Sequence, residues 1–223
     1  MFLEKLSGLF YFIKNIEFKI RTFNKFWFYF NHRRVKFVGA RSIIVGENSK
    51  IGDGSWLNIN DGKKGKLFIG KNCLIGRNNF ITVGGDIVIG DFFLSGSNCS
   101  IISSSHVINN PLSPYLKSGT THDNKICIGE NVFLGYGVSI VGNVTIGNGC
   151  VVGANSVVTK SIKPFTIAVG NPAYPIKEFC FKTNAWVKIN TAGATNSNYD
   201  GQFHPPLKFI QPLPALRNNL NVY

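Results

Sequence analysis

An aliphatic residue returns at every sixth position through the middle of this chain. Gly follows four of the six aliphatic residues in the clearest stretch, which are Ile128, Leu134, Ile140, Ile146, Val152 and Val158. An α-helix repeats every 3.6 residues and a β-strand every second residue, so a period of six requires a short strand followed by a corner. Three such units close one triangular coil. The sequence therefore predicts a solenoid of stacked coils.

The same period is present upstream of this stretch. It runs from Ile69 to Ile87, slips by two residues, and resumes from Ile89 to Ile101, while a weaker stretch lies at 45–57. We expect the slip and the segment 58–66 to be loops inserted between coils. The repeating part is therefore predicted to occupy residues 41–180.

Two further positions of the repeat have their own composition. The residue four places after each aliphatic is small enough for the interior of a narrow prism, as in Cys73, Cys99, Val132, Val138, Val144, Cys150 and Ser156. The residue before it is often Asn, which tolerates left-handed backbone angles at a corner, as at 72, 78, 98, 131, 143 and 155. Three of the five cysteines thus fall inside the prism, where a thiol acts as a compact apolar group.

The two ends of the chain differ from the repeating part. Between residues 1 and 40, Phe, Tyr and Trp are interleaved with Lys and Arg, which predicts one or two basic amphipathic helices. Two interpretations stay open for this segment: a cap on the first coil, or peripheral membrane contact through residues 1–36. After Phe181 the sequence is rich in Asn, Thr, Gly and Pro, which predicts an irregular extension over 181–223.

The overall charge favours anionic partners without naming one. The chain has 24 Lys and Arg against 11 Asp and Glu, a net charge of +13. Because no nucleic-acid-binding motif accompanies this charge, we do not expect a nucleic-acid partner. No apolar run reaches the roughly 20 residues of a membrane span, and no cleavable signal precedes the repeats, so we expect a cytoplasmic protein.

Several segments together resemble the hexapeptide-repeat acetyltransferases, which include galactoside and maltose O-acetyltransferases and bacterial surface-polysaccharide O-acetyltransferases. The matching segments are 103–106, 111–114, 126–135, 153–160 and 170–173. The resemblance implies an all-β fold, a left-handed parallel β-helix. It also implies a homotrimer with active sites between adjacent prisms, acetyl-CoA as the co-substrate, and no metal.

His106 matches the histidine that serves as general base in this family. It precedes a predicted loop over residues 107–125, as the family histidine does. A sugar hydroxyl is a weak nucleophile until a base takes its proton, and an imidazole suits that task near neutral pH. His122 lies in the loop and would reach the site only if the loop folds back.

The resemblance also implies a set of coenzyme A contacts. In the family, a backbone N–H at the position of Tyr136 stabilises the negative oxygen of the tetrahedral intermediate. The remaining matched positions lie along the pantetheine and the phosphates. The full set is Gly135, Tyr136, Ala154, Thr159, Lys160 and Lys177.

Two departures from the family concern the acceptor. Phe133 replaces the usual Trp, and Gly76 falls where galactoside enzymes have an Asn that contacts the sugar, so a simple galactoside is not the expected acceptor. Asn79 is a polar residue at an inward position, and Arg77 and Asn78 precede it. These three residues are our candidates for acceptor binding.

The sequence therefore predicts an acetyl-CoA-dependent O-acetyltransferase that modifies a sugar hydroxyl, in a bacterial surface polysaccharide or its precursor. A related alternative keeps the chemistry but makes the acceptor an amino sugar, serine or an antibiotic. Two alternatives of another class are a non-catalytic scaffold and a carbonic-anhydrase-like protein. The latter needs three His around zinc, and beyond His106 and His122 the sequence offers no evident third ligand.

Overall fold

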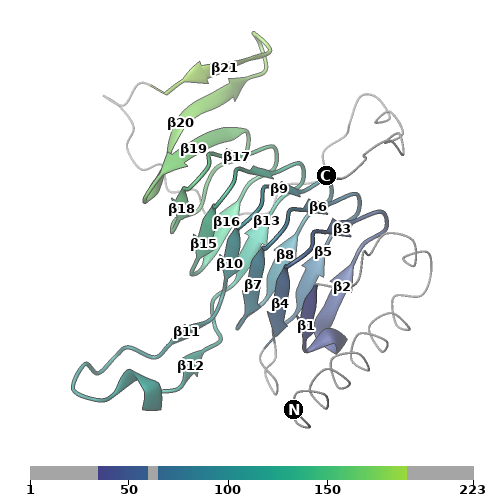
Figure 1. Cartoon of the computed structure of the whole chain (residues 1–223). Coiled ribbons are helices and arrows are strands. Elements are labelled where there is room, and N and C mark those ends of the chain that lie inside the picture. The colour runs from purple at the N-terminus through teal and green to yellow at the C-terminus, as the bar shows by residue number, and fades with distance from the viewer. Residues whose placement is uncertain (1–34, 60–64, 190–223) are drawn as a thin grey trace.

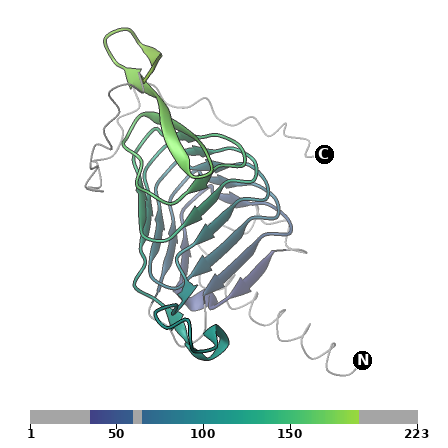
Figure 2. The same ribbon diagram turned by 90° about the vertical axis from the view of Figure 1, so that its left-hand side faces the viewer.

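The described strands form a three-sided solenoid (Figures 1 and 2). The computed structural model describes residues 35–59 and 65–189. We name its three faces sheets A, B and C. Sheet A contains β1 (Lys36–Val38), β4 (Trp56–Ile59), β7 (Phe80–Val83), β10 (Ser100–Ile102), β15 (Ser139–Val141) and β18 (Val157–Val158). Sheet B contains β2 (Ile43–Val45), β5 (Leu67–Ile69), β8 (Ile87–Ile89), β13 (Ile126–Ile128) and β16 (Val144–Ile146). Sheet C begins with β3 (Lys50–Ile51), β6 (Leu74–Ile75), β9 (Leu94–Ser95), β14 (Phe133–Leu134), β17 (Val151–Val152) and β19 (Thr166–Gly170).

The chain visits sheets B, C and A in turn, and within each sheet the strands of successive coils pair in parallel. For example, β14 pairs with β9 on one side and with β17 on the other. The predicted hexapeptide-repeat solenoid is therefore confirmed.

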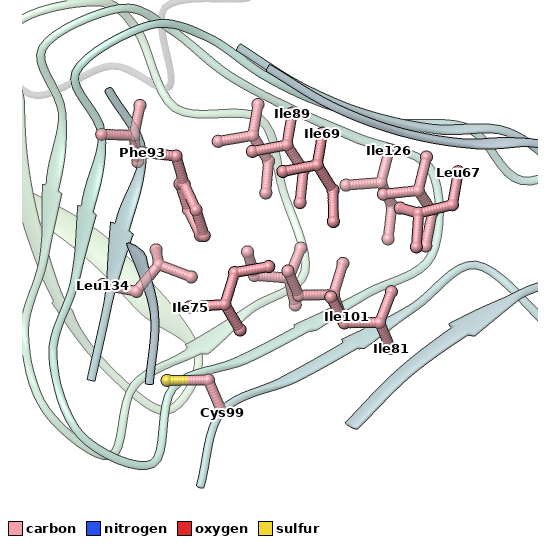
Figure 3. Close-up of a cluster of buried hydrophobic side chains, with 14 of the residues drawn as sticks. Leu67, Ile69, Ile75, Ile81, Ile89, Phe93, Cys99, Ile101, Ile126 and Leu134 are labelled. Carbon is pink, nitrogen blue, oxygen red and sulfur yellow. The ribbon is translucent and has the colours of Figure 1, made fainter. Parts of the chain in front are cut away.

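The core is a single column of apolar side chains inside the prism. Figure 3 shows aliphatic residues from all three sheets, including Ile69, Ile75 and Ile81, pointing toward one another. The six residues that defined the repeat all have an exposed fraction of 0%. The three inward cysteines are buried as expected, and burial raises the pKa of each thiol, for Cys150 to about 12. These thiols stay protonated at neutral pH and fill space.

The corners follow the predicted asparagine pattern with one exception. Five of the six predicted Asn residues have positive φ: Asn72, Asn78, Asn98, Asn131 and Asn155. Asn143 is not among the residues with positive φ, because Gly142 before it adopts the left-handed conformation, with φ 89°. Because Gly142 has no Cβ to clash at positive φ, it adopts the left-handed conformation in place of Asn143.

Among residues 35–59 and 65–189, the insertions into the repeat fall on one edge, where the chain passes from sheet A to sheet B. We call it the A–B edge. The slip in the period is the corner between β7 and β8, which confirms the first predicted loop. Of the second predicted loop, 58–66, residues 58–59 belong to β4 instead, and residues 60–64 lie outside the described ranges. The third insertion, between β10 and β13, contains the antiparallel strands β11 (Ser105–His106) and β12 (Thr120–Thr121) and projects from the prism (Figure 1).

The C-terminal end differs from the sequence prediction. Instead of an irregular extension from residue 181, β20 (Ala173–Cys180) and β21 (Ala185–Lys188) extend sheet C as an antiparallel hairpin. The ring centroids of Phe179 and Trp186 lie 5.3 Å apart across it. An antiparallel hairpin has no six-residue period, so the repeat pattern gave no signal for it.

The N-terminal boundary also needs a correction. Residues 36–38 were included in the predicted helical segment 1–40 but form β1, which pairs with β4 as the first strand of sheet A. The proposed cap or membrane contact falls almost wholly on residues outside the described ranges, as does the predicted tail from residue 190. Within 35–59 and 65–189, no helix is long and apolar enough to cross a membrane.

Candidate functional site

His106 lies at the base of the hairpin that projects from the A–B edge. It is the second residue of β11 and pairs with Thr120 of β12, and its side chain is exposed. The Thr120 hydroxyl lies 2.9 Å from Nε2 of His122. His122 therefore packs at the base of the same hairpin, while its Nδ1 atom is buried without a hydrogen-bond partner among the described residues.

A pair of glycines supports both legs of this hairpin. On the outgoing leg, a Cβ at Gly84 would lie 2.8 Å from Cα of Ser104, and on the returning leg a Cβ at Gly85 would lie 2.0 Å from the carbonyl oxygen of Asn124. Ser103 ties the support together: its hydroxyl accepts from the Gly84 N–H at 3.1 Å and donates to the Gly85 carbonyl at 2.9 Å. The hairpin that carries His106 thus rests directly on the glycine backbone.

A second set of predicted residues lies on the edge where the chain passes from sheet C to sheet A, which we call the C–A edge. Gly135 and Tyr136 form one corner of this edge, and Ala154 follows at the next corner, where a Cβ on Gly135 would lie 2.6 Å from the Ala154 nitrogen. Within the described ranges, the N–H groups of Tyr136 and Ala154 donate to no acceptor. Unpaired backbone N–H groups are strong donors for a ligand. The two corners therefore present donors to a ligand that runs along the edge.

The remaining candidates for coenzyme A binding lie on two different sides of the prism. Thr159 and Lys160 follow β18 and are exposed on the A–B edge, as His106 is. Lys177 lies on β20, where it pairs with Ile167 of β19, and so belongs to the side of sheet C. Because sheet A separates the A–B edge from the C–A edge, one chain does not bring all the predicted residues together.

The three acceptor candidates occupy different environments. Arg77 and Asn78 are exposed at a corner of the C–A edge. Asn79, by contrast, is 3% exposed. Its Nδ2 donates to the carbonyl oxygens of Gly76 and Gly96, at 2.7 and 3.0 Å, and its Oδ1 accepts from the Cys99 N–H at 2.8 Å. These bonds link successive corners from the inside, which accounts for a polar residue in the core and disfavours contact with an acceptor.

The geometry also reveals features that the sequence prediction missed. The Gly84–Gly85 support was visible only as the two-residue slip in the period. The hydrogen bond from Asn98 Nδ2 to the Tyr136 hydroxyl had no signal in the sequence. No group of three or more His, Cys, Asp or Glu that could hold a metal ion occurs within residues 35–59 and 65–189.

Replacing Asn79 tests its structural role. Asn79→Ala leaves two part-buried carbonyls and the buried Cys99 N–H without this partner, so we expect the free energy of unfolding to fall by about 2–3 kcal/mol. Urea denaturation followed by circular dichroism measures the change, and Asn109→Ala in the exposed hairpin is the matched control. If Asn79→Ala is as stable as wild type but binds the acceptor more weakly, Asn79 serves acceptor binding instead.

Replacing Gly85 tests the support of the hairpin. The Cβ of Gly85→Ala collides with the backbone of the returning leg, and a displacement of about 1 Å at a reacting group can cost about 100-fold in rate. We expect a loss of that order in transferase activity with the circular dichroism spectrum of the prism unchanged, whereas Ser113→Ala at the far end of the hairpin keeps full activity. Full activity of Gly85→Ala would show that the hairpin position does not depend on this contact.

Comparison with known proteins places this architecture in a family. Residues 128–160 match the family model described as bacterial transferase hexapeptide (six repeats). The galactoside O-acetyltransferase of Escherichia coli is 34% identical over 156 residues, which cover 67% of this chain and 73% of that protein. The putative lipopolysaccharide biosynthesis O-acetyl transferase WbbJ of Escherichia coli is 32% identical, covering 72% of this chain and 86% of that protein.

The relationship extends to solved structures. The N-acyltransferase AntD of Bacillus cereus, in complex with dTDP and 3-hydroxybutyryl-CoA, aligns with a TM-score of 0.57 and 26% identity, covering 68% of this chain and 80% of that one. Against two other curated relatives, the chain spans only 53% and 43% of their length. The six-residue repeat, the stacked coils and the identity to the two long-matching relatives agree, and the chain therefore belongs to the hexapeptide-repeat transferase family.

Proposed function

We propose that this protein is an acyl-CoA-dependent O-acetyltransferase that modifies a sugar hydroxyl. The observation that carries the proposal is the pair of stacked corners on the C–A edge, whose Tyr136 and Ala154 N–H groups have no acceptor within the described ranges. The pantetheine arm of coenzyme A is a thin chain that bears amide carbonyls, and its acyl end bears a thioester carbonyl. Both kinds of oxygen can accept hydrogen bonds from these two N–H groups.

In the proposed reaction, His106 removes the proton of the acceptor hydroxyl as its oxygen attacks the thioester carbon. The carbonyl oxygen becomes negative in the tetrahedral intermediate, and the Tyr136 N–H donates a hydrogen bond to it. The intermediate then collapses, the carbon–sulfur bond breaks, and the imidazolium returns its proton to the leaving thiolate. The products are the acetyl ester and free coenzyme A, and no metal takes part.

The proposed site is shared between two subunits. His106, Thr159 and Lys160 lie on the A–B edge, while Gly135, Tyr136 and Ala154 lie on the C–A edge. If the A–B edge of one prism faces the C–A edge of the next, the contact is heterologous, and a rotation of about 120° between neighbours closes it into a ring of three. A homotrimer then has three equivalent grooves, each with a general base from one subunit and N–H donors from its neighbour. The Lys160 and Lys177 ammonium groups complement the phosphates of coenzyme A.

The acceptor class is proposed from the relatives. Two of them are named for O-acetylation, of galactosides and in lipopolysaccharide biosynthesis. A sugar of a surface polysaccharide or its precursor is therefore our first choice, and the cytoplasm, which supplies acetyl-CoA, is the proposed place of reaction. The likeness to AntD, an N-acyltransferase of which a mutant was solved with dTDP-4-amino-4,6-dideoxyglucose, favours an amino sugar as the second choice.

Thiol release from acetyl-CoA in the presence of acceptor panels tests the activity. Oligosaccharides and sugar nucleotides with free hydroxyls are compared with the matching amino sugars, and mass spectrometry locates the new acetyl group. Acceptor-dependent release with an ester product supports O-acetylation, and an amide product would replace it with N-acetylation. No acceptor-dependent release with any member of the panels would contradict the proposal.

His106→Ala tests the general base. A positioned base contributes about 100- to 10,000-fold in rate, so we expect kcat to fall by about two to four orders of magnitude while the melting temperature stays unchanged. His106→Asn retains some hydrogen bonding and is expected to fall within the same range. His122→Asn in the same hairpin is the control for a structural effect. Activity of His106→Ala within about threefold of wild type would remove His106 from the mechanism.

Mixed trimers test the shared site. His106→Ala inactivates the A–B edge, and Ala154→Trp blocks the C–A edge, so each homotrimer should be inactive. In trimers refolded from an equal mixture, half of the A–B edges and half of the C–A edges are intact, which gives about a quarter of the wild-type activity. If the mixture stays as inactive as either variant alone, the two edges do not meet in one site.

A further inference from the structure

The Tyr136 side chain makes a contact that the proposed reaction does not use. The residue is 55% exposed, and its hydroxyl accepts a hydrogen bond from Nδ2 of Asn98. Asn98 belongs to the preceding corner of the C–A edge, one coil earlier. The Tyr136 side chain therefore spans the distance between two successive corners of the same edge.

Both ends of this contact are held by backbone hydrogen bonds between stacked corners. Asn98 has a φ of 60°, and its N–H donates to the Arg77 carbonyl at 2.9 Å. The Tyr136 carbonyl accepts from the Asn155 N–H at 2.8 Å, and the Gly137 N–H donates to the Ser97 carbonyl at 3.0 Å. The backbone is therefore fixed on either side, and the hydrogen bond to Asn98 holds the phenol ring across the two corners.

The position of this ring matters for the acyl group. The corners follow one another along the C–A edge in the order Ser97, Tyr136, Ala154. In the proposed function, on which this inference rests, coenzyme A runs along the Ala154 corner and its thioester carbonyl meets the Tyr136 N–H. The next step along the same row is the Ser97 corner, and the tethered ring crosses toward it. An acyl group longer than acetyl extends into this space.

We infer that Tyr136 and Asn98 limit the acyl group of the donor to acetyl. The phenol ring blocks the groove beyond the second acyl carbon, and the Asn98 amide keeps the ring from swinging aside. The family fold by itself does not impose this limit, since AntD was solved with 3-hydroxybutyryl-CoA, a donor with a four-carbon acyl group. The limit is thus assigned to these two side chains of this chain.

The test is the ratio of kcat/KM for butyryl-CoA to kcat/KM for acetyl-CoA with one acceptor. Tyr136→Ser keeps the backbone N–H but removes the ring, so the ratio should rise about tenfold or more, the effect of one or two methylenes in a restricted pocket. Tyr136→Phe and Asn98→Gly leave the ring in place but remove the hydrogen bond between the two side chains, so they should raise the ratio by less. Asn98→Gly preserves the left-handed backbone, because Gly adopts positive φ without strain.

Two matched variants control for indirect effects. Tyr174→Ser removes another tyrosine, which is 54% exposed on β20, and Asn131→Gly replaces another corner asparagine, which has a φ of 53°. Neither residue contacts Tyr136 in the described hydrogen bonds, so neither variant should change the ratio. Propionyl-CoA, with one carbon more than acetyl-CoA, should give intermediate ratios throughout.

The outcomes separate this inference from the proposed function. If Tyr136→Ser retains acetyl transfer and the ratio stays at the wild-type value, the inference is overturned while the acetyltransferase stands. A higher KM for the acceptor with an unchanged ratio would overturn it as well, because the ring would then serve the acceptor. If wild type transfers no acyl group from any of the three thioesters, the inference fails together with the proposed function.

Discussion

The structure depends on the flat stacking of coil corners at the spacing of paired β-strands, about 4.8 Å. Gly135 shows how little room this leaves, since a Cβ there would lie 2.6 Å from the nitrogen of Ala154. Corners packed this closely form straight columns along each edge, so backbone groups at the same position repeat at the strand spacing. A long, thin ligand can then meet a row of identical N–H donors. The stacked N–H groups of Tyr136 and Ala154, which we propose bind coenzyme A, are therefore a direct consequence of the packing that closes the core.

The three edges are not equivalent, because the A–B edge carries the insertions and the C–A edge does not. In the described part of the chain, the insertions between coils fall on the A–B edge, whereas the corners of the C–A edge keep the regular repeat. The hairpin with His106 can project there because Gly84 and Gly85 let its legs rest on the backbone of the preceding coil. The C–A edge stays flat and offers its N–H groups. A groove made from a projecting edge and a flat edge needs two prisms, which is the physical reason for placing the proposed site between subunits.

The sequence was most informative where local rules govern the backbone. The six-residue period identified the inward residues, because every coil must fill the same narrow prism, and the asparagines marked corners that require positive φ. It was least informative where contacts join residues distant in sequence. The pairing of β20 with β21 follows no six-residue period. The hydrogen bonds of Asn79 inside the prism were not predicted either, because the sequence shows only a polar residue at an inward position. The bond between Asn98 and Tyr136 links residues on either side of the hairpin insertion, which no spacing rule connects. The motif containing His106 predicts a role for the residue, and the resemblance predicted a site between adjacent prisms; the fold adds that His106 and Tyr136 lie on different edges of the prism.

A structure of the assembled protein with coenzyme A and an acceptor analogue tests the central claim most directly. The account requires the pantetheine arm to run along the C–A edge of one subunit, with the sulfur near the Tyr136 N–H. The acceptor hydroxyl should lie within hydrogen-bond distance, about 2.6–3.2 Å, of the His106 imidazole of the neighbouring subunit. Coenzyme A bound along another edge, or His106 and Tyr136 of different subunits too far apart to share one ligand, would contradict it.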